Sequence, residues 1–214
     1  MVLALCTMFQ LASCARSGVK EANNTDKDMQ TEEKNANYNM TNSKKVLVAF
    51  YSRPGNNYSV GNVKTGNTQI LAEMIAKETG ATLFNIEPVK PYPTDYNKCT
   101  EVAKKELNAA ARPAVKADIK AEDYDIIFIG YPIWWGDAPM PVYTFIEKHN
   151  WKGKTVIPFC THEGSGMCNE AKIKAACKGA TVLGGLGMYG HTAQNDRATA
   201  KTEMLKWLGK TMKK

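Results

Sequence analysis

The sequence predicts an α/β fold in which a doubly wound, five-stranded parallel sheet has the strand order 2-1-3-4-5. From Lys44 onward, short apolar runs alternate with helical segments in five pairs. Three of the runs, VLVAFY, IIFIGY and VIPFC, are continuously apolar, as strands covered on both faces should be. This part of the chain is long enough for one domain with a sizeable core, and no second domain is expected.

Strands are expected at the apolar runs, over residues 45–51, 82–86, 125–131, 155–160 and 181–188. Helices are expected over residues 68–79, 94–111, 141–148, 169–178 and 194–210. The first helix should end at Gly80, because glycine suits a left-handed cap. The second should begin with Thr94 as its cap and stop before Arg112. In a sheet of this order, a ligand binds at the carboxyl ends of the first and third strands.

The charge balance is basic, with a formal net charge of +7 for the whole chain. Residues 14–43 contain four basic and five acidic side chains, so the folded part is more basic still, at +8. A basic domain can bind nucleic acid or anionic lipid. Here the lysines are spread along the predicted helices as single and paired charges, without an arginine-rich run. This pattern predicts no nucleic-acid partner.

Six cysteines in an exported protein can indicate disulfides. Two lie in the leader, and the other four show neither CxxC nor metal-ligand spacing: Cys99, Cys160, Cys168 and Cys177. We therefore expect them to be small, buried apolar side chains, and we expect no metal site. No histidine–acid pair with convincing spacing supports Cys160 as a nucleophile, so no catalytic residue is assigned.

The first residues differ in character from the rest. Residues 2–12 are almost wholly apolar but too few to span a bilayer as a helix, which fits the apolar part of an export signal. The segment Leu11-Ala12-Ser13-Cys14 resembles the lipobox of bacterial lipoproteins. The resemblance implies a signal peptide over residues 1–13, lipidation of Cys14, and anchoring on the periplasmic or outer side of a membrane. An ordinary signal peptide is the alternative.

Residues 15–43 are rich in Asn, Lys, Glu, Asp and Thr and contain almost no large apolar side chain. Such a segment cannot bury enough surface to offset the entropy of ordering, so residues 14–43 are predicted to be a disordered tether. The folded domain is accordingly expected over residues 44–214. The membrane is expected as a partner only through the lipid anchor.

Two polar segments flank the first predicted strand and helix, residues 51–53 (Tyr-Ser-Arg) and 65–68 (Thr-Gly-Asn-Thr). Hydroxyls, a glycine and free N–H groups at a helix N-terminus form a phosphate site that the helix dipole favours. Residues 61–68 approach a P-loop, but Asn67 stands where that motif requires lysine, so a nucleoside triphosphate is rejected. Residues 52–57 alone could form the cradle, and a plain capped helix is the other alternative. We favour a joint cradle of Ser52, Arg53, Gly66, Asn67 and Thr68.

The third strand runs into two adjacent tryptophans, Trp134 and Trp135. Neighbouring side chains of an extended segment face opposite ways, so both cannot point into the core. At least one is expected to be exposed at the sheet edge, beside Gly136, which permits close approach to the backbone. A flat aromatic ligand would explain this, and a partner-binding patch or a partly buried tryptophan is the alternative. The candidate site residues in this loop are Pro132, Ile133, Trp134, Trp135 and Gly136.

The fourth strand ends in the turn Thr-His-Glu-Gly-Ser-Gly, residues 161–166. Its N–H groups and two hydroxyls suit the polar edge of a pyrimidine-like ring. It is not a nucleophile elbow, because Glu163 stands where G-x-S-x-G requires glycine. His162 is interpreted as a loop hydrogen-bonder rather than a catalyst. The candidate site residues are Thr161, His162, Gly164, Ser165 and Gly166.

Taken together, the three loops resemble the flavodoxin family over about residues 44–214. Ser52 and the Gly66–Thr68 turn are similar to the family's phosphate loop. Residues 131–136 are similar to its first isoalloxazine loop, and residues 161–166 to its second. The resemblance implies a flavodoxin-like three-layer sandwich that binds flavin mononucleotide (FMN) non-covalently.

Three departures from the family accompany the resemblance. Residues 54–64 look like an insertion in the phosphate loop, placed to fold over the flavin or its phosphate. The second flavin loop lacks the usual tyrosine, so one ring face is open or is covered by Tyr58 or Tyr189. The domain is basic whereas typical flavodoxins are acidic, which puts their usual electron-transfer partners in doubt.

The resemblance implies electron transfer through the bound flavin, with a redox partner protein or a small-molecule electron acceptor as partner. The first alternative is an oxidoreductase that moves hydride from NAD(P)H to a quinone or nitro compound. A second alternative, from another class, is a lipoprotein that has lost the cofactor and binds an extracellular ligand through Trp134 and Trp135.

Overall fold

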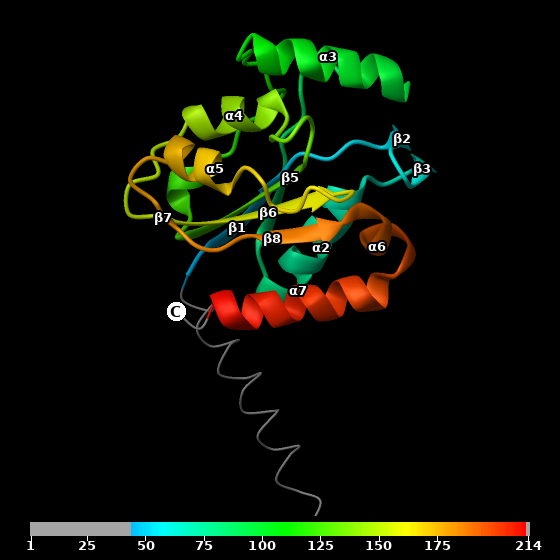
Figure 1. Ribbon diagram of the computed structural model, residues 1–214. Coiled ribbons are helices and arrows are strands. Elements are labelled where there is room, and N and C mark those ends of the chain that lie inside the picture. The colour runs from blue at the N-terminus through cyan, green and yellow to red at the C-terminus, as the bar shows by residue number, and fades with distance from the viewer. Residues whose placement is uncertain (1–43, 213–214) are drawn as a thin grey trace, which may run out of the picture. The chain divides into compact units, whose positions relative to one another are not determined.

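The computed structural model describes residues 44–212. The predicted signal peptide, the lipidation site Cys14 and the predicted tether lie outside the described residues. Within these bounds the chain forms one parallel sheet between two layers of helices (Figure 1). The strands are β1 (Val46–Phe50), β4 (Thr82–Asn85), β5 (Ile126–Pro132), β6 (Thr155–His162), β7 (Thr181–Val182) and β8 (Leu186–Tyr189).

The hydrogen-bonded strand order is β4-β1-β5-β6-β7, with β8 also paired to β6. Every pairing in this sheet is parallel. The order 2-1-3-4-5 predicted from the sequence is therefore confirmed. In a parallel sheet all carboxyl ends lie at one edge, so the loops after β1, β5 and β6 leave from the same side.

The helices form one layer on each face of the sheet (Figure 1). One layer contains α3 (Tyr96–Asn108), α4 (Met140–Glu147) and α5 (Glu170–Ala176), and the other contains α2 (Asn67–Thr79), α6 (Gly190–Asn195) and α7 (Arg197–Thr211). Successive residues of β1 join different cores: Leu47 and Ala49 pack toward one layer, Val48 and Phe50 toward the other. Burial on both faces is the reason that this strand is apolar without alternation.

The fifth predicted strand is divided into β7 and β8, which is a correction to the single run expected over residues 181–188. Both pieces pair with β6, and the gap lies opposite Ile157 and Pro158. Pro158 has no N–H group to donate to a neighbouring strand, so the ladder is interrupted there. The backbone N–H of Gly185, inside the gap, donates instead to the Glu170 side chain at 2.6 Å.

Two helix ends also differ from the prediction. Asp95, not Thr94, caps α3, because its carboxylate accepts the N–H of Lys98 at 2.9 Å. The single helix expected at the C-terminal end is broken into α6 and α7 at Asp196, whose side chain caps α7 through the N–H of Thr199. The predicted left-handed cap at Gly80 is confirmed, with φ of 68°.

The predicted insertion in the loop after β1 is an antiparallel hairpin formed by β2 (Gly55–Asn57) and β3 (Gly61–Val63). It lies beyond the carboxyl end of β1 and projects from the sheet edge (Figure 1). A short 3₁₀ helix, η1 (Ala121–Asp123), precedes β5 at the opposite edge.

Gly130 leads to a first prediction, because it lies beside Phe159 at the centre of the sheet. A Cβ added at Gly130 would lie 2.1 Å from the ring of Phe159, which is fully buried. Gly130→Ala is expected to lower the free energy of unfolding by about 1–3 kcal/mol through overpacking. Urea unfolding measures this. Gly209→Ala in α7 is the control, since nothing lies within 4 Å of its added Cβ, and it should not destabilise the protein.

Candidate functional site

The three predicted loops enclose one pocket of about 340 Å³ at the carboxyl edge of the sheet. Ten of the fifteen predicted cofactor residues line it: Arg53, Asn67, Pro132, Ile133, Trp134, Trp135, Gly136, Thr161, His162 and Ser165. The other five, which do not line it, are Ser52, Gly66, Thr68, Gly164 and Gly166. The structure therefore brings segments about a hundred residues apart in the chain into one concave surface.

The turn before α2 is built around a close approach between Gly66 and the end of β1. A Cβ added at Gly66 would lie 2.3 Å from Ser52 Oγ and 2.6 Å from the carbonyl oxygen of Arg53. Ser52 Oγ accepts the N–H of Gln69 at 3.0 Å and so caps the first turn of α2 from outside the helix. The earlier N–H groups of α2 have no partner within the helix, and the helix dipole favours an anion beside them.

Asn67, the first residue of α2, lines the pocket. Its side-chain oxygen is buried and has no hydrogen-bond partner among the described residues. A buried acceptor without a donor costs about 1–3 kcal/mol. A ligand that carries a hydroxyl or N–H group would satisfy this atom.

Arg53, a predicted cradle residue, lies in the pocket wall and also makes contacts within the protein that the sequence did not predict. Its guanidinium is buried and donates to the carbonyl oxygens of Pro93, Thr94 and Asn56, so four of its five N–H groups are used. These bonds tie the hairpin to the segment before α3. Within residues 44–212, no carboxylate forms an ion pair with this guanidinium. The pocket wall therefore carries a positive charge whose hydrogen-bond partners, among the described residues, are all neutral carbonyl oxygens.

Thr68 and Thr161 link the first loop to the third. Both are buried, and their hydroxyl oxygens lie 2.7 Å apart. Thr68, a predicted cofactor residue, does not line the pocket, but its hydroxyl contacts that of Thr161, which does. Its position supports a role in joining the loops.

Residues 134–137 form a tight turn in which Trp134 and Asp137 exchange backbone hydrogen bonds of 2.8 and 3.0 Å. The two central residues, Trp135 and Gly136, have φ of 53° and 75°, as a type I′ turn requires. Glycine adopts this conformation readily, but for tryptophan it is strained. The turn is a two-residue reversal that sends adjacent tryptophans in different directions.

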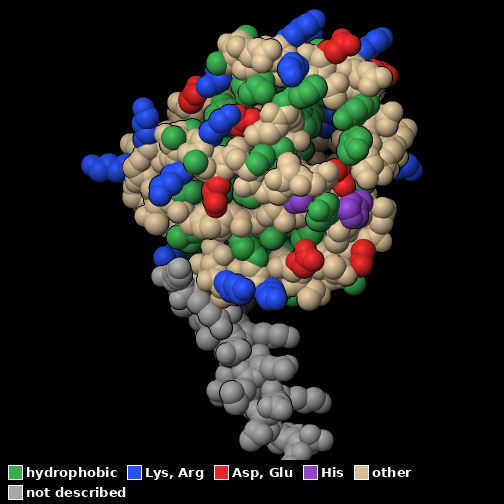
Figure 2. Space-filling view, in the orientation of Figure 1, with side chains coloured by type: hydrophobic (Ala, Val, Ile, Leu, Met, Phe, Trp, Pro, Cys, Tyr) green, Lys and Arg blue, Asp and Glu red, His purple; other side chains and the backbone are tan. Residues whose placement is uncertain are grey.

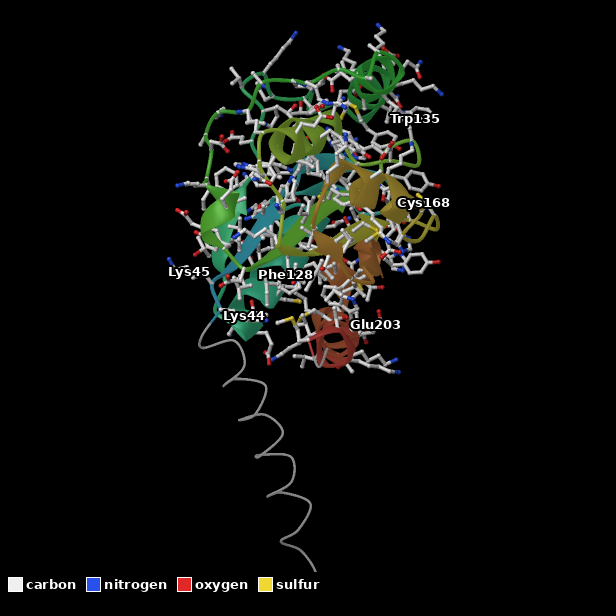
Figure 3. The ribbon with its side chains drawn as sticks, turned by 90° about the vertical axis from the view of Figure 1, so that its left-hand side faces the viewer. Lys44, Lys45, Phe128, Trp135, Cys168 and Glu203 are labelled. Carbon is white, nitrogen blue, oxygen red and sulfur yellow. The ribbon has the colours of Figure 1, made fainter. Side chains whose placement is uncertain are left out.

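Trp134 is partly buried against Tyr51 and Tyr92, with ring centroids 5.5 and 5.0 Å away. Trp135 is 52% exposed and lies on α3 (Figure 3), where its Nε1 donates to the carbonyl oxygen of Thr100 at 3.0 Å. Lys104 Nζ lies 4.1 Å from the centre of its ring, within cation–π distance. The expectation that at least one of the two tryptophans is exposed is confirmed.

The buried carboxylate of Asp137 anchors this turn to neighbouring elements. The carboxylate accepts bonds from the backbone N–H of Ala138, Tyr143 Oη, Asn169 Nδ2 and Lys172 Nζ, at 2.6–3.1 Å. Burial raises the pKa of Asp137, but the hydrogen bonds from Lys172, Tyr143 and Asn169 outweigh burial and hold the pKa below its ordinary value. A charged carboxylate thus connects the tryptophan turn to α4 and α5.

The third loop is ordered by its own hydrogen bonds. His162 is buried, and its Nδ1 accepts the N–H of Gly164 at 3.0 Å. Burial lowers the pKa of His162, so the neutral ring is favoured. These contacts support the interpretation of His162 as a loop hydrogen-bonder.

The described cysteines are all free thiols, and three of them are buried as expected: Cys99, Cys160 and Cys177. Burial raises the pKa of Cys160 to about 12, which disfavours the thiolate that a nucleophile needs. Cys168 is the correction. It is exposed (Figure 3), and its Sγ lies 3.4 Å from the carbonyl oxygen of Gly136.

Part of the pocket wall was not identified from the sequence: Asn57, Tyr58, Tyr96, Cys99, Thr100, Ala103 and Glu163. Tyr58, at the hairpin turn, stacks on Tyr96 of α3 with ring centroids 6.3 Å apart. Tyr58 had been considered as a cover for the ring, and the structure places it in the wall. The α3 residues could not be identified from the sequence. A helical pattern predicts the helix itself, but it does not show which part of the sheet edge the helix lies against.

The charged side chains on the face shown in Figure 2 and the metal-ligating side chains of residues 44–212 form no concentrated site. Lysines and arginines are scattered around the face shown in Figure 2 and do not form one patch. Residues 44–212 contain no group of three or more His, Cys, Asp or Glu that could hold a metal ion. None of the helices in this range is long and apolar enough to cross a membrane.

Comparison with known proteins gives consistent results. Residues 45–210 match a family model described as flavodoxin. Two crystal structures of proteins provisionally assigned as flavoproteins are similar. One, from Bacteroides eggerthii DSM 20697, has 32% identity and a TM-score of 0.63, and the match covers 78% of this chain and 98% of that one. The other, from Bacteroides uniformis ATCC 8492, has 30% identity and a TM-score of 0.60, with coverage of 76% and 98%.

A flavoprotein in complex with FMN from Lactobacillus acidophilus NCFM shares the fold at 22% identity and a TM-score of 0.55. The match covers 71% of this chain and 97% of that one. No curated protein matches the chain.

Proposed function

Because this chain belongs to the flavodoxin family, we propose that it binds FMN non-covalently in the carboxyl-edge pocket and transfers electrons through it. The observation that carries the proposal is the convergence of a helix N-terminus, an exposed tryptophan turn and a polar loop around one pocket of about 340 Å³. This volume falls in the range of small-molecule sites. The FMN complex of the Lactobacillus relative supports the same cofactor.

The first loop has the features that a phosphate needs. The Gly66 turn leaves N–H groups of α2 unpaired within the helix, and the dipole adds a partial positive charge there. The Arg53 guanidinium adds a full positive charge and keeps one N–H group that no described residue uses. A phosphate would supply the counter-charge.

The other two loops would hold the flavin ring and its polar chain. Trp135 offers an exposed aromatic surface, Thr161 and Ser165 offer hydroxyls, and the unpaired oxygen of Asn67 would accept from a hydroxyl of the ribityl chain. When bound, the flavin supplies the redox chemistry by accepting and donating electrons. The pocket-lining residues would bind and orient the flavin and exclude water from the part of the ring that they cover.

The visible spectrum of the purified full-length protein, before and after addition of FMN, tests the proposal. We expect flavin absorption bands and quenched flavin fluorescence. Trp135→Ala should weaken FMN binding by about two- to twelvefold, because stacking contributes about 0.5–1.5 kcal/mol. The control Trp207→Ala, whose indole donates to Gly184 on the other face, should leave FMN binding unchanged. A colourless protein that rejects added FMN would overturn the proposal.

A second candidate function is hydride transfer from NAD(P)H to a small acceptor such as a quinone or nitro compound. It is favoured by the third loop, where the pocket-lining residues Thr161, His162, Glu163 and Ser165 include no tyrosine or tryptophan to stack on a flavin face. Stopped-flow mixing of the FMN-loaded protein with NADH and with NADPH distinguishes the two. Rapid bleaching of the flavin band supports the enzyme, whereas an electron carrier should react slowly with both.

We also propose that the protein is exported and anchored by a lipid at Cys14, as the lipobox-like segment Leu11–Cys14 suggests. An anchor that precedes the domain would leave the pocket accessible, because the first described residues lie away from it. Lys44 and Lys45 precede β1 at the amino edge of the sheet, apart from Trp135 at the pocket (Figure 3). Metabolic labelling with a fatty-acid analogue, lost in Cys14→Ser, tests the anchor.

A further inference from the structure

Glu163 lines the pocket, yet both of its carboxylate oxygens are bound to a residue on another element. Oε1 accepts the backbone N–H of His191 at 2.8 Å, and Oε2 lies 2.7 Å from His191 Nδ1. His191 is the second residue of α6. The side chain of Glu163 is only 14% exposed, whereas that of His191 is 49% exposed, so Glu163 approaches a helix start that faces water. The third loop is thus tied to the start of α6.

The start of α6 also contacts residues 65–68, the turn before α2 that is proposed to bind the phosphate and is called the phosphate turn. A Cβ added at Gly190 would lie 2.1 Å from Asn67 Nδ2 and 2.7 Å from Glu163 Oε1. Three segments therefore meet at Gly190, where any larger residue would require the side chains of Asn67 and Glu163 to move. A second tie comes from Gln194, whose Nε2 donates to the carbonyl oxygen of Thr65 at 2.6 Å.

These contacts form a continuous path from Glu163 through the His191 backbone and Gly190 to Asn67. Both ends of the path line the pocket. Loss of the Glu163 carboxylate would remove two hydrogen bonds from His191, and the Gly190 backbone, against which the Asn67 amide packs, would be held less firmly. The Thr68–Thr161 contact joins the same two loops elsewhere, but it does not touch Asn67's amide.

We propose that Glu163 is a positioning residue that fixes Asn67 and the third loop together through the start of α6. The inference rests on the proposed FMN binding, because it names what sets the geometry of that site. Glu163 acts through His191 and Gly190, and its own carboxylate has no role in chemistry.

The chain contains a matched control for this arrangement. Glu122 also holds a backbone N–H with one oxygen (Asn150, 2.7 Å) and an imidazole with the other (His149 Nδ1, 3.2 Å). Glu122 belongs to η1, at the opposite edge of the sheet from the pocket. Glu122→Ala therefore removes the same kinds of bonds without touching the site.

The test measures FMN affinity of the full-length apoprotein by quenching of flavin fluorescence. Glu163→Ala should weaken binding by about tenfold, the effect of losing charge-assisted hydrogen bonds, whereas Glu122→Ala should leave affinity within about twofold. Glu163→Gln should restore most of the loss, because the amide oxygen can still accept the His191 N–H. Combined with Asn67→Ala, Glu163→Ala should add little further loss, since both variants remove the same contact.

Two outcomes would overturn the proposal: Glu163→Ala weakens FMN binding no more than Glu122→Ala does, or the Glu163 and Asn67 effects multiply independently. If the wild-type protein does not bind FMN, the proposed function fails instead. The positioning role is then decided by hydrogen exchange in the flavin-free protein. The amides of residues 65–68 should exchange faster in Glu163→Ala than in Glu122→Ala, and equal rates would reject it.

Discussion

Asp137→Ala is expected to lower the free energy of unfolding by about 2–4 kcal/mol, the range for removing one partner of a buried charged network. The residue is 3% exposed, and its loss leaves Tyr143 and Asn169 without their acceptor. The Lys172 side chain is 63% exposed, so its ammonium group can be solvated when the carboxylate is removed. The expected loss of stability is therefore smaller than for a buried, unpaired charge. Chemical denaturation measures the effect.

The control for Asp137 is Glu87→Ala, which removes a salt bridge to Lys116 in which both side chains are about half exposed. Its effect should be below about 1 kcal/mol. Asp137→Asn should lie between the two, because the amide oxygen can still accept hydrogen bonds. An Asp137→Ala effect as small as that of Glu87→Ala would show that the network does not stabilise the turn.

The same network predicts a dependence on pH. The folded-state pKa of Asp137 lies below its ordinary value, so the carboxylate contributes stability above the unfolded pKa, about 3.9. This contribution is lost as the pH falls through the folded value. The stability difference between wild type and Asp137→Asn should therefore shrink as the pH drops below about 4, and a constant difference would contradict the assignment.

Gly66→Ala is expected to weaken FMN binding by about a hundredfold. The added Cβ would lie 2.3 Å from Ser52 Oγ and 2.6 Å from a backbone oxygen, so the turn that presents the α2 N–H groups must move. Overpacking of this kind costs about 1–3 kcal/mol, and the upper end corresponds to a hundredfold. FMN titration of the apoprotein measures the loss.

Gly184→Ala serves as the control for Gly66, because nothing lies within 4 Å of its added Cβ and its backbone does not adopt a positive φ. Its FMN affinity should equal that of the wild type. If Gly66→Ala binds FMN as tightly as Gly184→Ala, the phosphate turn does not depend on the close approach of Gly66 to β1.

Much of the candidate site could be predicted because each loop follows a strand whose direction the sequence indicates. Trp134 and Trp135 follow an apolar run, and their adjacency required one of them to be exposed. Arg53 was placed correctly in the pocket wall, but its use as a clamp for Pro93 and Thr94 was not predictable. Those carbonyls lie forty residues further along, in a segment without a regular pattern.

The sequence by itself determined the alternation of strands and helices, the parallel sheet and the cap at Gly80, because these follow from periodicity and from residues near each other in the chain. The strand order pairs distant segments such as β1 and β5, and the sequence predicted it because the repeated strand–helix units admit that order and the family resemblance implies it. Only the tertiary structure decided that residues of the hairpin and of α3 line the pocket, that Asp137 anchors the tryptophan turn, and that Glu163 binds His191. Each of these depends on contacts between different elements, and side-chain direction at such contacts is set by packing rather than by local pattern.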